Sequence, residues 1–251
     1  MEICDESEIW VKKDDDFVFG HTKVILRDAD DEYFYAKTEK RAGDVSLADI
    51  DESGLSKIPA DQIWPLANAE FTRAPDPLPS TSYFKRPELV DYGLTNFDCG
   101  SDILAEVEAC EVLRRHPHPN IAPYLGCVVK DGRIRGLVFP KYSTTLTEVL
   151  RQGNSFDRGR CLRGIEAGVL HMHATGLVHN DLSPDNIMMD GDDPVIIDFD
   201  TCKREGDKLG SKLGSHEWSP EDQEYAVREN DLYNLSKIEE ALTAREIDMA
   251  C

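Results

Sequence analysis

Short apolar runs alternate with acidic clusters over the first sixty residues. The runs DFVFG, KVILR and EYFYAK are rich in β-branched and aromatic residues, which favour strands. Acidic clusters at 14–16, 28–32 and 49–52 separate these runs and are typical of solvated loops. The pattern predicts a β-rich, acidic N-terminal extension over residues 1–60, folded as a hairpin or small meander.

Residues 61–142 predict a connector, three strands and a helix. Three prolines between residues 75 and 79 exclude both a helix and a central strand, and the strand-like STSYFKRP follows them. Apolar residues recur at every third position through 102–115, which predicts one face of a helix. The segments LGCVVK and IRGLVF then predict two strands joined by a turn at Asp131-Gly132.

Beyond Tyr142 the pattern becomes mainly helical. Helices are predicted over 143–153 and 161–175, with Gly176 ending the second one. Two strand-like pieces, LVHND and PVIIDFD, follow, and 231–247 predicts a last helix. We therefore predict an α+β fold of two lobes, a β-rich small lobe over 61–142 and a shortened helical large lobe over 143–251.

Composition narrows the classes of function. With 28 basic and 49 acidic residues the formal net charge is −21, so DNA, RNA and anionic membranes are poor partners. No apolar run approaches the roughly 20 residues needed to cross a bilayer, and the acidic first ten residues do not match a signal peptide. Seven dispersed cysteines without a C-x-x-C pair argue against a disulfide framework or zinc site. We expect an intracellular protein, in the cytoplasm or the nucleus.

The segment HNDLSPDN, followed by DFD, carries the candidate chemistry. It places Asp181, Asn186 and Asp198 on adjacent strand ends. Phosphoryl transfer needs such a set, because one carboxylate must orient the attacking hydroxyl while oxygen ligands hold Mg²⁺ against the phosphates. The order and spacing of the two segments make a chance match a poor explanation.

The chain resembles the eukaryotic protein kinase family, whose signatures are H-R-D-L-x-x-x-N and D-F-G. The resemblance implies that Asp181 is the catalytic base and that Asn186 and Asp198 bind Mg²⁺. It also implies that Lys85, on the strand before the helix, contacts the phosphates of ATP and pairs with Glu106. The residues leave rivals open for these last two roles: Lys37 for the lysine, and Glu108 or Glu111 for the glutamate.

Further segments match in family order. Ser219-Pro220-Glu221 resembles A-P-E, Asp231 resembles the buried aspartate beneath the catalytic loop, and HPNIAPYLGCVV resembles the entry to the fourth strand. Phe139 takes the gatekeeper position, which implies that the Pro140 carbonyl and the Tyr142 N–H contact adenine. The amino-acid sequences of these segments are most similar to those of divergent kinase-like proteins of filamentous fungi.

Four departures from the family pattern weaken the match. No G-x-G-x-x-G precedes Lys85, so backbone amides do not close over the phosphates in the usual way. Asn180 replaces the arginine that pairs with a phosphorylated activation loop, and Ser183 replaces a lysine near the γ-phosphate. Asp200 replaces the glycine of D-F-G, which adds a carboxylate and removes a flexible backbone position.

The function predicted from these residues is ATP- and Mg²⁺-dependent phosphorylation of Ser or Thr hydroxyls in a protein substrate. The acidic clusters add a weaker expectation that the substrate is basic. Two alternatives stay open. One is a pseudokinase that binds partners with little or no catalysis, and the other is a small-molecule phosphotransferase, which does without the lysine that Ser183 replaces.

Overall fold

The structure is a computed structural model of the chain, and it describes residues 1–248 except 15, 94–96, 210–217 and 219–222. The described part divides into two compact units. The first contains Met1–Pro65 and Pro87–Ser101, and the second contains Leu66–Arg86 and the chain from Asp102 onward. The division into lobes at residue 142 remains a prediction.

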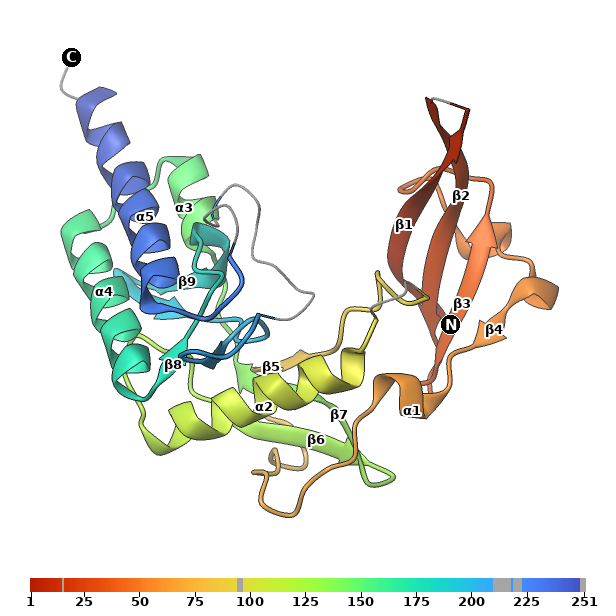
Figure 1. Cartoon of the computed structure of the whole chain (residues 1–251), viewed down its shortest axis with the longest axis horizontal. Helices are drawn as coiled ribbons and strands as arrows, with labels where there is room; N and C mark the ends of the chain where they lie inside the picture. The colour runs from red at the N-terminus through yellow and green to blue at the C-terminus, as the bar shows by residue number, and fades with distance from the viewer. Residues whose placement is uncertain (15, 94–96, 210–217, 219–222, 249–251) are drawn as a thin grey trace. The chain divides into compact units, whose positions relative to one another are not determined.

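The first unit is built on a four-stranded antiparallel sheet (Figure 1). Its strands follow chain order: β1 (Glu2–Lys13), β2 (Asp16–Arg27), β3 (Tyr33–Thr38) and β4 (Ser56–Lys57). Val24, Leu26 and Ala36 are buried on one face beneath the segment that contains the short helices η1 (Leu47–Asp49) and η2 (Glu52–Gly54). Helix α1 (Ala60–Ile63) follows β4.

The meander predicted in this region is present, with two differences. DFVFG and KVILR form one continuous strand, β2, because His21 and Thr22 between them pair with Ile9 and Glu8 of β1. A side chain at Gly20 would meet the Ile9 carbonyl oxygen at 3.0 Å, which explains a glycine in mid-strand. Residues 2–13, whose acidic composition gave no strand prediction, form β1 by pairing along β2.

The second unit begins with a three-stranded antiparallel sheet in the order β5-β7-β6. Its strands are β5 (Ser82–Lys85), β6 (Gly126–Lys130) and β7 (Arg133–Pro140). The turn at Asp131-Gly132 joins β6 to β7 as predicted, with φ angles of 53° and 72°. Such positive angles are those that a two-residue hairpin turn requires. Helix α2 (Cys99–Arg115) lies between β5 and β6 in the chain and contains the predicted helix 102–115.

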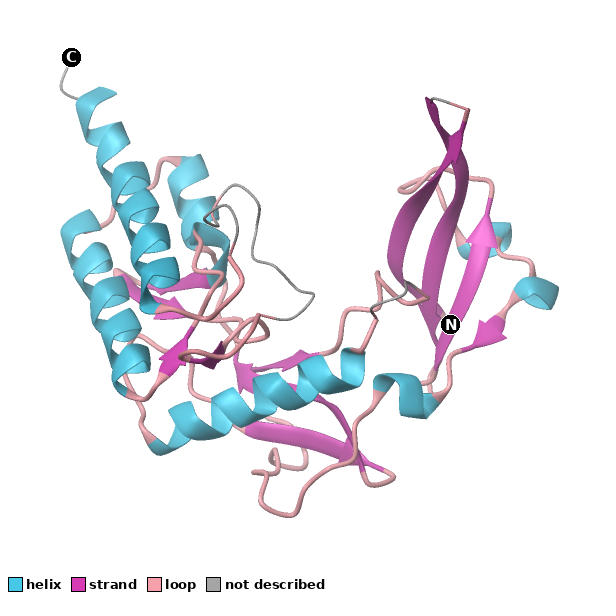
Figure 2. Cartoon of the chain, viewed as in Figure 1, coloured by secondary structure: helices cyan, strands magenta, loops and turns pink. Residues whose placement is uncertain are grey.

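The rest of the second unit is mainly helical, as Figure 2 shows. The helices are α3 (Leu146–Gln152), α4 (Arg158–Ala174) and α5 (Arg228–Asp248). Two short antiparallel pairs accompany them: β8 (Leu177–Val178) with β11 (Lys203–Arg204), and β9 (Ile187–Asp190) with β10 (Asp193–Ile196). Strand β9 was not predicted.

Helix α4 forms the centre of this packing. Ile165, Val169 and Met172 on one face are fully buried. Gly164 and Gly168 bring the helix against β10, because a side chain at either position would collide with Pro194 or Ile196. The α+β fold class is therefore as predicted. Among the described helices, none combines the length and apolar character needed to span a bilayer.

Candidate active site

Lys85 joins two acidic residues that are distant in the sequence. It is the last residue of β5, and its Nζ lies 2.6 Å from Glu106 Oε1 on α2 and 2.6 Å from Asp198 Oδ1 after β10. The Glu106 side chain is only 5% exposed, whereas that of Asp198 is 36% exposed. The pair Lys85–Glu106 is therefore internal, and Asp198 lies at the edge open to solvent.

The charges of this cluster stabilise one another against burial. Burial alone would lower the pKa of Lys85, but Glu106, Asp198 and Asp200 together raise it well above its ordinary value. Burial likewise raises the pKa of Asp198, yet Lys85 outweighs it and holds that pKa below its usual range. For Glu106, burial prevails over the attraction of Lys85, so its pKa is raised. Lys85 thus stays positive and Asp198 negative at neutral pH.

The rival residues lie elsewhere. Glu111 accepts hydrogen bonds from the backbone N–H and the hydroxyl of Thr72, so it fastens the connector to α2. Glu108 lines a pocket on another side of α2. Lys37 is exposed on β3 in the first unit, with its Nζ 5.8 Å from the centre of the Tyr35 ring. The structure thus pairs Lys85 with Glu106.

The loop after β8 brings the other two predicted residues together. The amide nitrogen of Asn186 donates to the Asp181 carbonyl oxygen at 2.8 Å and to its Oδ2 at 3.0 Å. The backbone N–H of Ile197 donates to the Asn186 carbonyl oxygen at 3.0 Å, which places this loop beside Asp198. Asn186 therefore orients Asp181 on one side and borders Asp198 on the other.

Asp231 holds the start of this loop from beneath. It is fully buried in α5 and accepts hydrogen bonds from the N–H groups of His179 (3.0 Å) and Asn180 (2.8 Å). A third contact joins its Oδ2 to His173 Nε2 at 2.8 Å. Asn180 has a φ of 66°, a left-handed conformation that asparagine tolerates better than most residues.

Two contributors to this loop were missed from the sequence. Asn180 donates its side-chain amide to the carbonyls of Val178 and Thr201, and its Oδ1 accepts from Asn230 at 2.9 Å. The Thr201 hydroxyl donates to the His179 carbonyl at 2.8 Å. No local pattern marks Thr201 or Asn230, because both act through contacts across 20 to 50 residues of chain. Asn180 stands where the family pattern has an arginine. Its uncharged side chain makes three hydrogen bonds within the fold.

Aromatic rings connect the loop to the strand β7. Phe199 is fully buried, and its ring centre lies 5.8 Å from that of His179 and 6.3 Å from that of Phe139. His179 Nε2 also contacts the Ile197 carbonyl at 3.0 Å. These residues form a packed support for the loop, and the charge of His179 adds to that of Lys85 in lowering the pKa of Asp198.

The end of β7 is the predicted adenine edge. Pro140 is paired with Ser82 of β5, and the next N–H, that of Lys141, donates to the Thr81 carbonyl at 2.8 Å. Proline cannot donate to a strand, so Pro140 has only its carbonyl for hydrogen bonding. Tyr142 is half-buried, and burial followed by the charge of Asp190 raises the pKa of its hydroxyl.

Gly136 allows β5 to lie close to β7. Its φ is 151°, and a side chain there would place a carbon atom 2.2 Å from the Lys85 carbonyl oxygen. Such a contact is too short for any atom pair that is not bonded, so the strand that presents Lys85 depends on the absence of a side chain across from it.

The residues present fit a magnesium ion. Mg²⁺ prefers oxygen ligands, and Asp198 supplies carboxylate oxygens at the solvent edge of the cluster. Because the amide nitrogen of Asn186 is bound to Asp181, its oxygen is the atom available to a cation. Asp200 adds a carboxylate within hydrogen-bonding reach of Asp198.

Two departures can now be assessed locally. The replacement of glycine by Asp200 does not strain the backbone, because Asp200 has an ordinary negative φ. The residue of this segment in the left-handed conformation is Asp198, with a φ of 64°. Ser183 is buried and precedes the short helix η3 (Pro184–Asn186). Ser219-Pro220-Glu221 falls outside the described residues.

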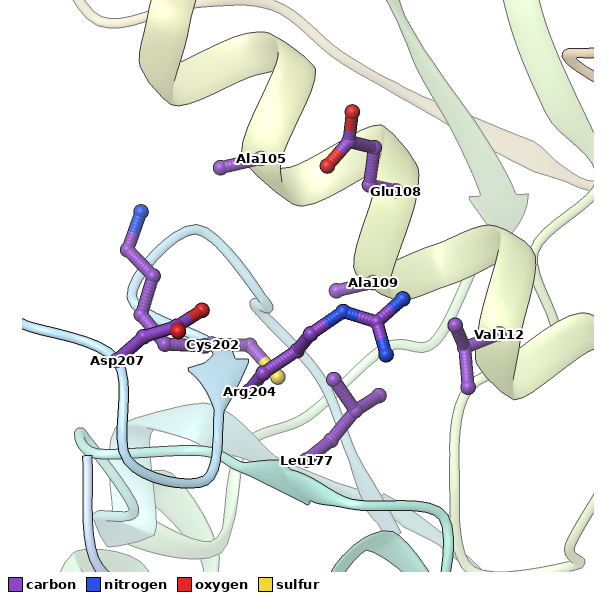
Figure 3. Close-up of a pocket in the computed structure, with 9 residues that line it drawn as sticks. Ala105, Glu108, Ala109, Val112, Leu177, Cys202, Arg204 and Asp207 are labelled. Carbon is purple, nitrogen blue, oxygen red and sulfur yellow. The ribbon is translucent and has the colours of Figure 1, made fainter.

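A separate pocket of about 170 Å³ lies between α2 and β11 (Figure 3). Ala105, Ala109 and Val112 line it on the helix, while Leu177 and Arg204 line the opposite side. Figure 3 shows the Arg204 side chain directed toward α2. None of the predicted site residues lines this pocket, so it is not the candidate site.

A family model described as "Protein kinase domain" matches residues 94–238, which are 145 of the 251 residues. The chain belongs to the protein kinase family. The match contains Glu106, Asp181, Asn186 and Asp198, and it begins after Lys85. The unmatched stretch is the one in which the glycine-rich loop is missing from the sequence.

Similar curated proteins carry kinase names. The chain is 36% identical over 111 residues to "Probable serine/threonine-protein kinase mkcC" of Dictyostelium discoideum, covering 41% of this chain and 12% of that protein. It is 31% identical over 119 residues to mitogen-activated protein kinase kinase kinase mkh1 of Cytospora mali, covering 43% and 6%. It is 28% identical over 117 residues to human receptor-interacting serine/threonine-protein kinase 1, covering 45% and 17%. The matched segments thus span less than a fifth of each of these three relatives.

Proposed function

We propose that this chain transfers the γ-phosphoryl group of ATP, in the presence of Mg²⁺, to Ser or Thr hydroxyls of a protein. The observation that carries the proposal is the contact of Lys85 with both Glu106 and Asp198, at 2.6 Å each, beside the Asp181–Asn186 pair. Phosphoryl transfer depends mainly on positioning and on charge stabilisation, and this arrangement provides both.

Each residue has a distinct part in the proposed reaction. Asp181, oriented by Asn186, accepts the proton of the attacking hydroxyl. Lys85, held in place by Glu106, contacts the phosphates, and its positive charge offsets theirs. The Pro140 carbonyl and the Tyr142 N–H hold adenine. Mg²⁺, when bound by the oxygens of Asn186 and Asp198, supplies further positive charge against the phosphates.

The choice of a hydroxyl acceptor in a protein rests on the relatives and on charge. Two of the relatives are named as serine/threonine-protein kinases. The net charge of −21 favours a basic acceptor, because opposite charges increase the rate of encounter.

A second candidate is a pseudokinase that binds partners without turnover. The sheet that carries Lys85 has three strands, β5-β7-β6, and within the described residues no glycine-rich hairpin precedes β5 in it. Nucleotide phosphates would then lack the backbone amides that usually cover them. This observation predicts weak nucleotide binding under either candidate function.

The deciding experiment measures Mg²⁺-dependent ADP formation with a basic protein acceptor. The wild-type chain is compared with Asp181→Asn, which removes the base, and with Asp185→Asn, which changes an exposed aspartate of the same loop. We expect turnover at or below the low end of about 1–100 s⁻¹. Asp181→Asn should lower it by roughly 10²–10⁴-fold, and Asp185→Asn should leave it unchanged.

Circular dichroism establishes that all three proteins are folded. Turnover in the folded wild type no higher than in folded Asp181→Asn would reject the enzyme proposal and favour the pseudokinase. Equal losses in both variants would instead assign the effect to the loop and not to the base.

A further inference from the structure

Strand β1 is an open edge of the sheet in the first unit. It pairs with β2 along one side, and in the part of the chain that the structure describes no strand pairs with its other side. Figure 1 shows β1 at one border of this sheet. The strand is 12 residues long. An open edge of this length presents backbone groups that can pair with another strand.

The stretch Asp5–Lys13 of β1 is regular enough for such pairing. The extra residue in the pairing of β1 with β2 near its start is Cys4, before this stretch. The second irregularity, between Ile9 and Trp10, falls on the partner strand, where Gly20 is the additional residue. Asp5–Lys13 therefore offers nine consecutive residues in strand conformation.

Charge is divided along this stretch. Asp5, Glu6 and Glu8 lie in its first half, and Lys12 and Lys13 end it. Both lysines are exposed, and within the described residues no ion pair involves either one. The acidic residues are half-buried and contact their own unit: Asp5 accepts from the Leu89 N–H, and Glu6 from the Gly43 N–H at 2.7 Å.

We propose that two copies of this chain associate by antiparallel pairing of their β1 strands, centred on Ile9. In this register Asp5 lies opposite Lys13 of the partner subunit, and Glu6 lies opposite Lys12 of the partner subunit. The two-fold symmetry repeats each contact, so every exposed lysine of the stretch meets a carboxylate. The two four-stranded sheets become one continuous sheet.

The side-chain geometry supports this register. Opposite residues in an antiparallel pair point to the same face, and alternate residues along a strand share a face. Asp5 and Lys13 are both odd-numbered and Glu6 and Lys12 both even-numbered, so each pair meets on one face. A carboxylate can accept several hydrogen bonds, so the present contacts of Asp5 and Glu6 leave them able to bind a lysine.

A second copy is favoured over other occupants. In the register centred on Ile9, the acidic start of each stretch lies opposite the basic end of the other. If the register shifts by two residues in either direction, one of these charged ends no longer lies opposite the nine-residue stretch of the partner strand. Trp10 and Val11, which are 48% and 45% exposed, are then partly covered. An anionic membrane would be repelled by the acidic half of the stretch and by the aspartates that follow it at 14–16.

The test is sedimentation velocity of the full chain over about a hundredfold range of concentration. The wild type should show a dimer fraction that rises with concentration. Lys12→Glu places like charges opposite each other twice per dimer and should raise the dissociation constant about tenfold. Glu6→Lys should have a similar effect. The exchange E6K/K12E restores opposite charges and should recover much of the dimer.

Lys37→Glu is the matched control, since it makes the same charge change on the central strand β3 and should dimerise as the wild type does. Circular dichroism confirms that each variant is folded. A monomeric wild type at every concentration overturns the proposal. Dimers unaffected by Lys12→Glu would place the interface elsewhere, and failure of the exchange to recover dimers would overturn the register.

Discussion

At the scale of the residue, the Lys85 ammonium stabilises carboxylates that burial disfavours. Glu106 is almost completely enclosed, and its raised pKa shows that its negative charge is costly even with Lys85 at 2.6 Å. Removal of the lysine would leave that charge without compensation. The same residue that we assign to the phosphates therefore contributes to the stability of the chain before any nucleotide binds.

Lys85→Met should consequently destabilise the protein, because methionine fills the space without supplying the charge. Breaking a buried pair by removing one partner costs about 3–5 kcal/mol. Urea unfolding followed by circular dichroism measures the loss, with Lys37→Met as an exposed control. A loss no larger than that of the control would mean that Lys85 and Glu106 do not depend on each other.

A second residue-scale prediction concerns two stacked histidines. The rings of His118 and His171 are 4.8 Å apart, and burial, followed by the charge of His171, lowers the pKa of His118. The unfolded chain then binds this proton more readily than the folded chain does. The free energy of unfolding should therefore decrease as the pH falls through about 6.5 and below.

Urea unfolding between pH 7.5 and pH 5.5 tests this histidine pair. His118→Asn removes the titrating ring, and its side chain can still accept the Asn120 N–H that His118 accepts at 3.2 Å. The variant should lose less stability on acidification than the wild type. Identical pH dependences would show that the pair does not contribute.

At the scale of the element, the sequence predicts structures that depend on neighbouring residues. The turn at Asp131-Gly132 and the helix 102–115 were predicted because their signals are local. The helix predicted from residue 143 begins instead at Leu146, because the Thr145 side chain caps it by accepting the Glu148 N–H. Strand β1 depends on pairing with β2, and β9 on pairing with β10, so neither was evident from local pattern.

The site follows the same division. The HND and DFD segments gave Asp181, Asn186 and Asp198, and the structure places them side by side through short loops. The choice of Lys85 over Lys37, and of Glu106 over its neighbours, required the packing of β5 against α2. The roles of Thr201 and Asn230 could not be predicted from the sequence, because only the tertiary fold brings these residues into contact with the loop.

Helix α5 and the loop after β8 are expected to lose stability together. In the wild type the Asp231 carboxylate accepts hydrogen bonds from the N–H groups of His179 and Asn180 and contacts His173 Nε2. Asp231→Asn keeps the size of the side chain but replaces one of the accepting oxygens with an NH₂ group, which cannot accept. An unsatisfied buried donor costs about 1–3 kcal/mol, and more where a charged group is lost. We expect a decrease of about 3 kcal/mol in unfolding free energy, against little change for Asp185→Asn. Equal stabilities would show that the loop does not depend on α5.

At the scale of the whole molecule, 49 acidic side chains exceed 28 basic ones, and the excess repels itself in the folded state. Salt screens repulsion and attraction alike. Repulsion predominates here because there are more acidic side chains than basic ones to pair with them. At low ionic strength the melting temperature should therefore increase as NaCl is added up to about 0.15 M, where the screening length is near 8 Å. Scanning calorimetry measures the change, and a decrease would mean that ion pairs determine stability.

The close approach of β5 to β7 at Gly136 has a consequence for heritable variation. Every amino-acid replacement that one nucleotide change can produce at a glycine codon introduces a side chain, and each would push the Lys85 carbonyl away. If the proposed activity benefits the organism, natural variants of the gene should retain glycine at this codon and tolerate changes at the exposed Gly54, where an added carbon meets no atom and φ lies outside the left-handed region. A position with no reactive group would then be as constrained as the lysine on the neighbouring strand.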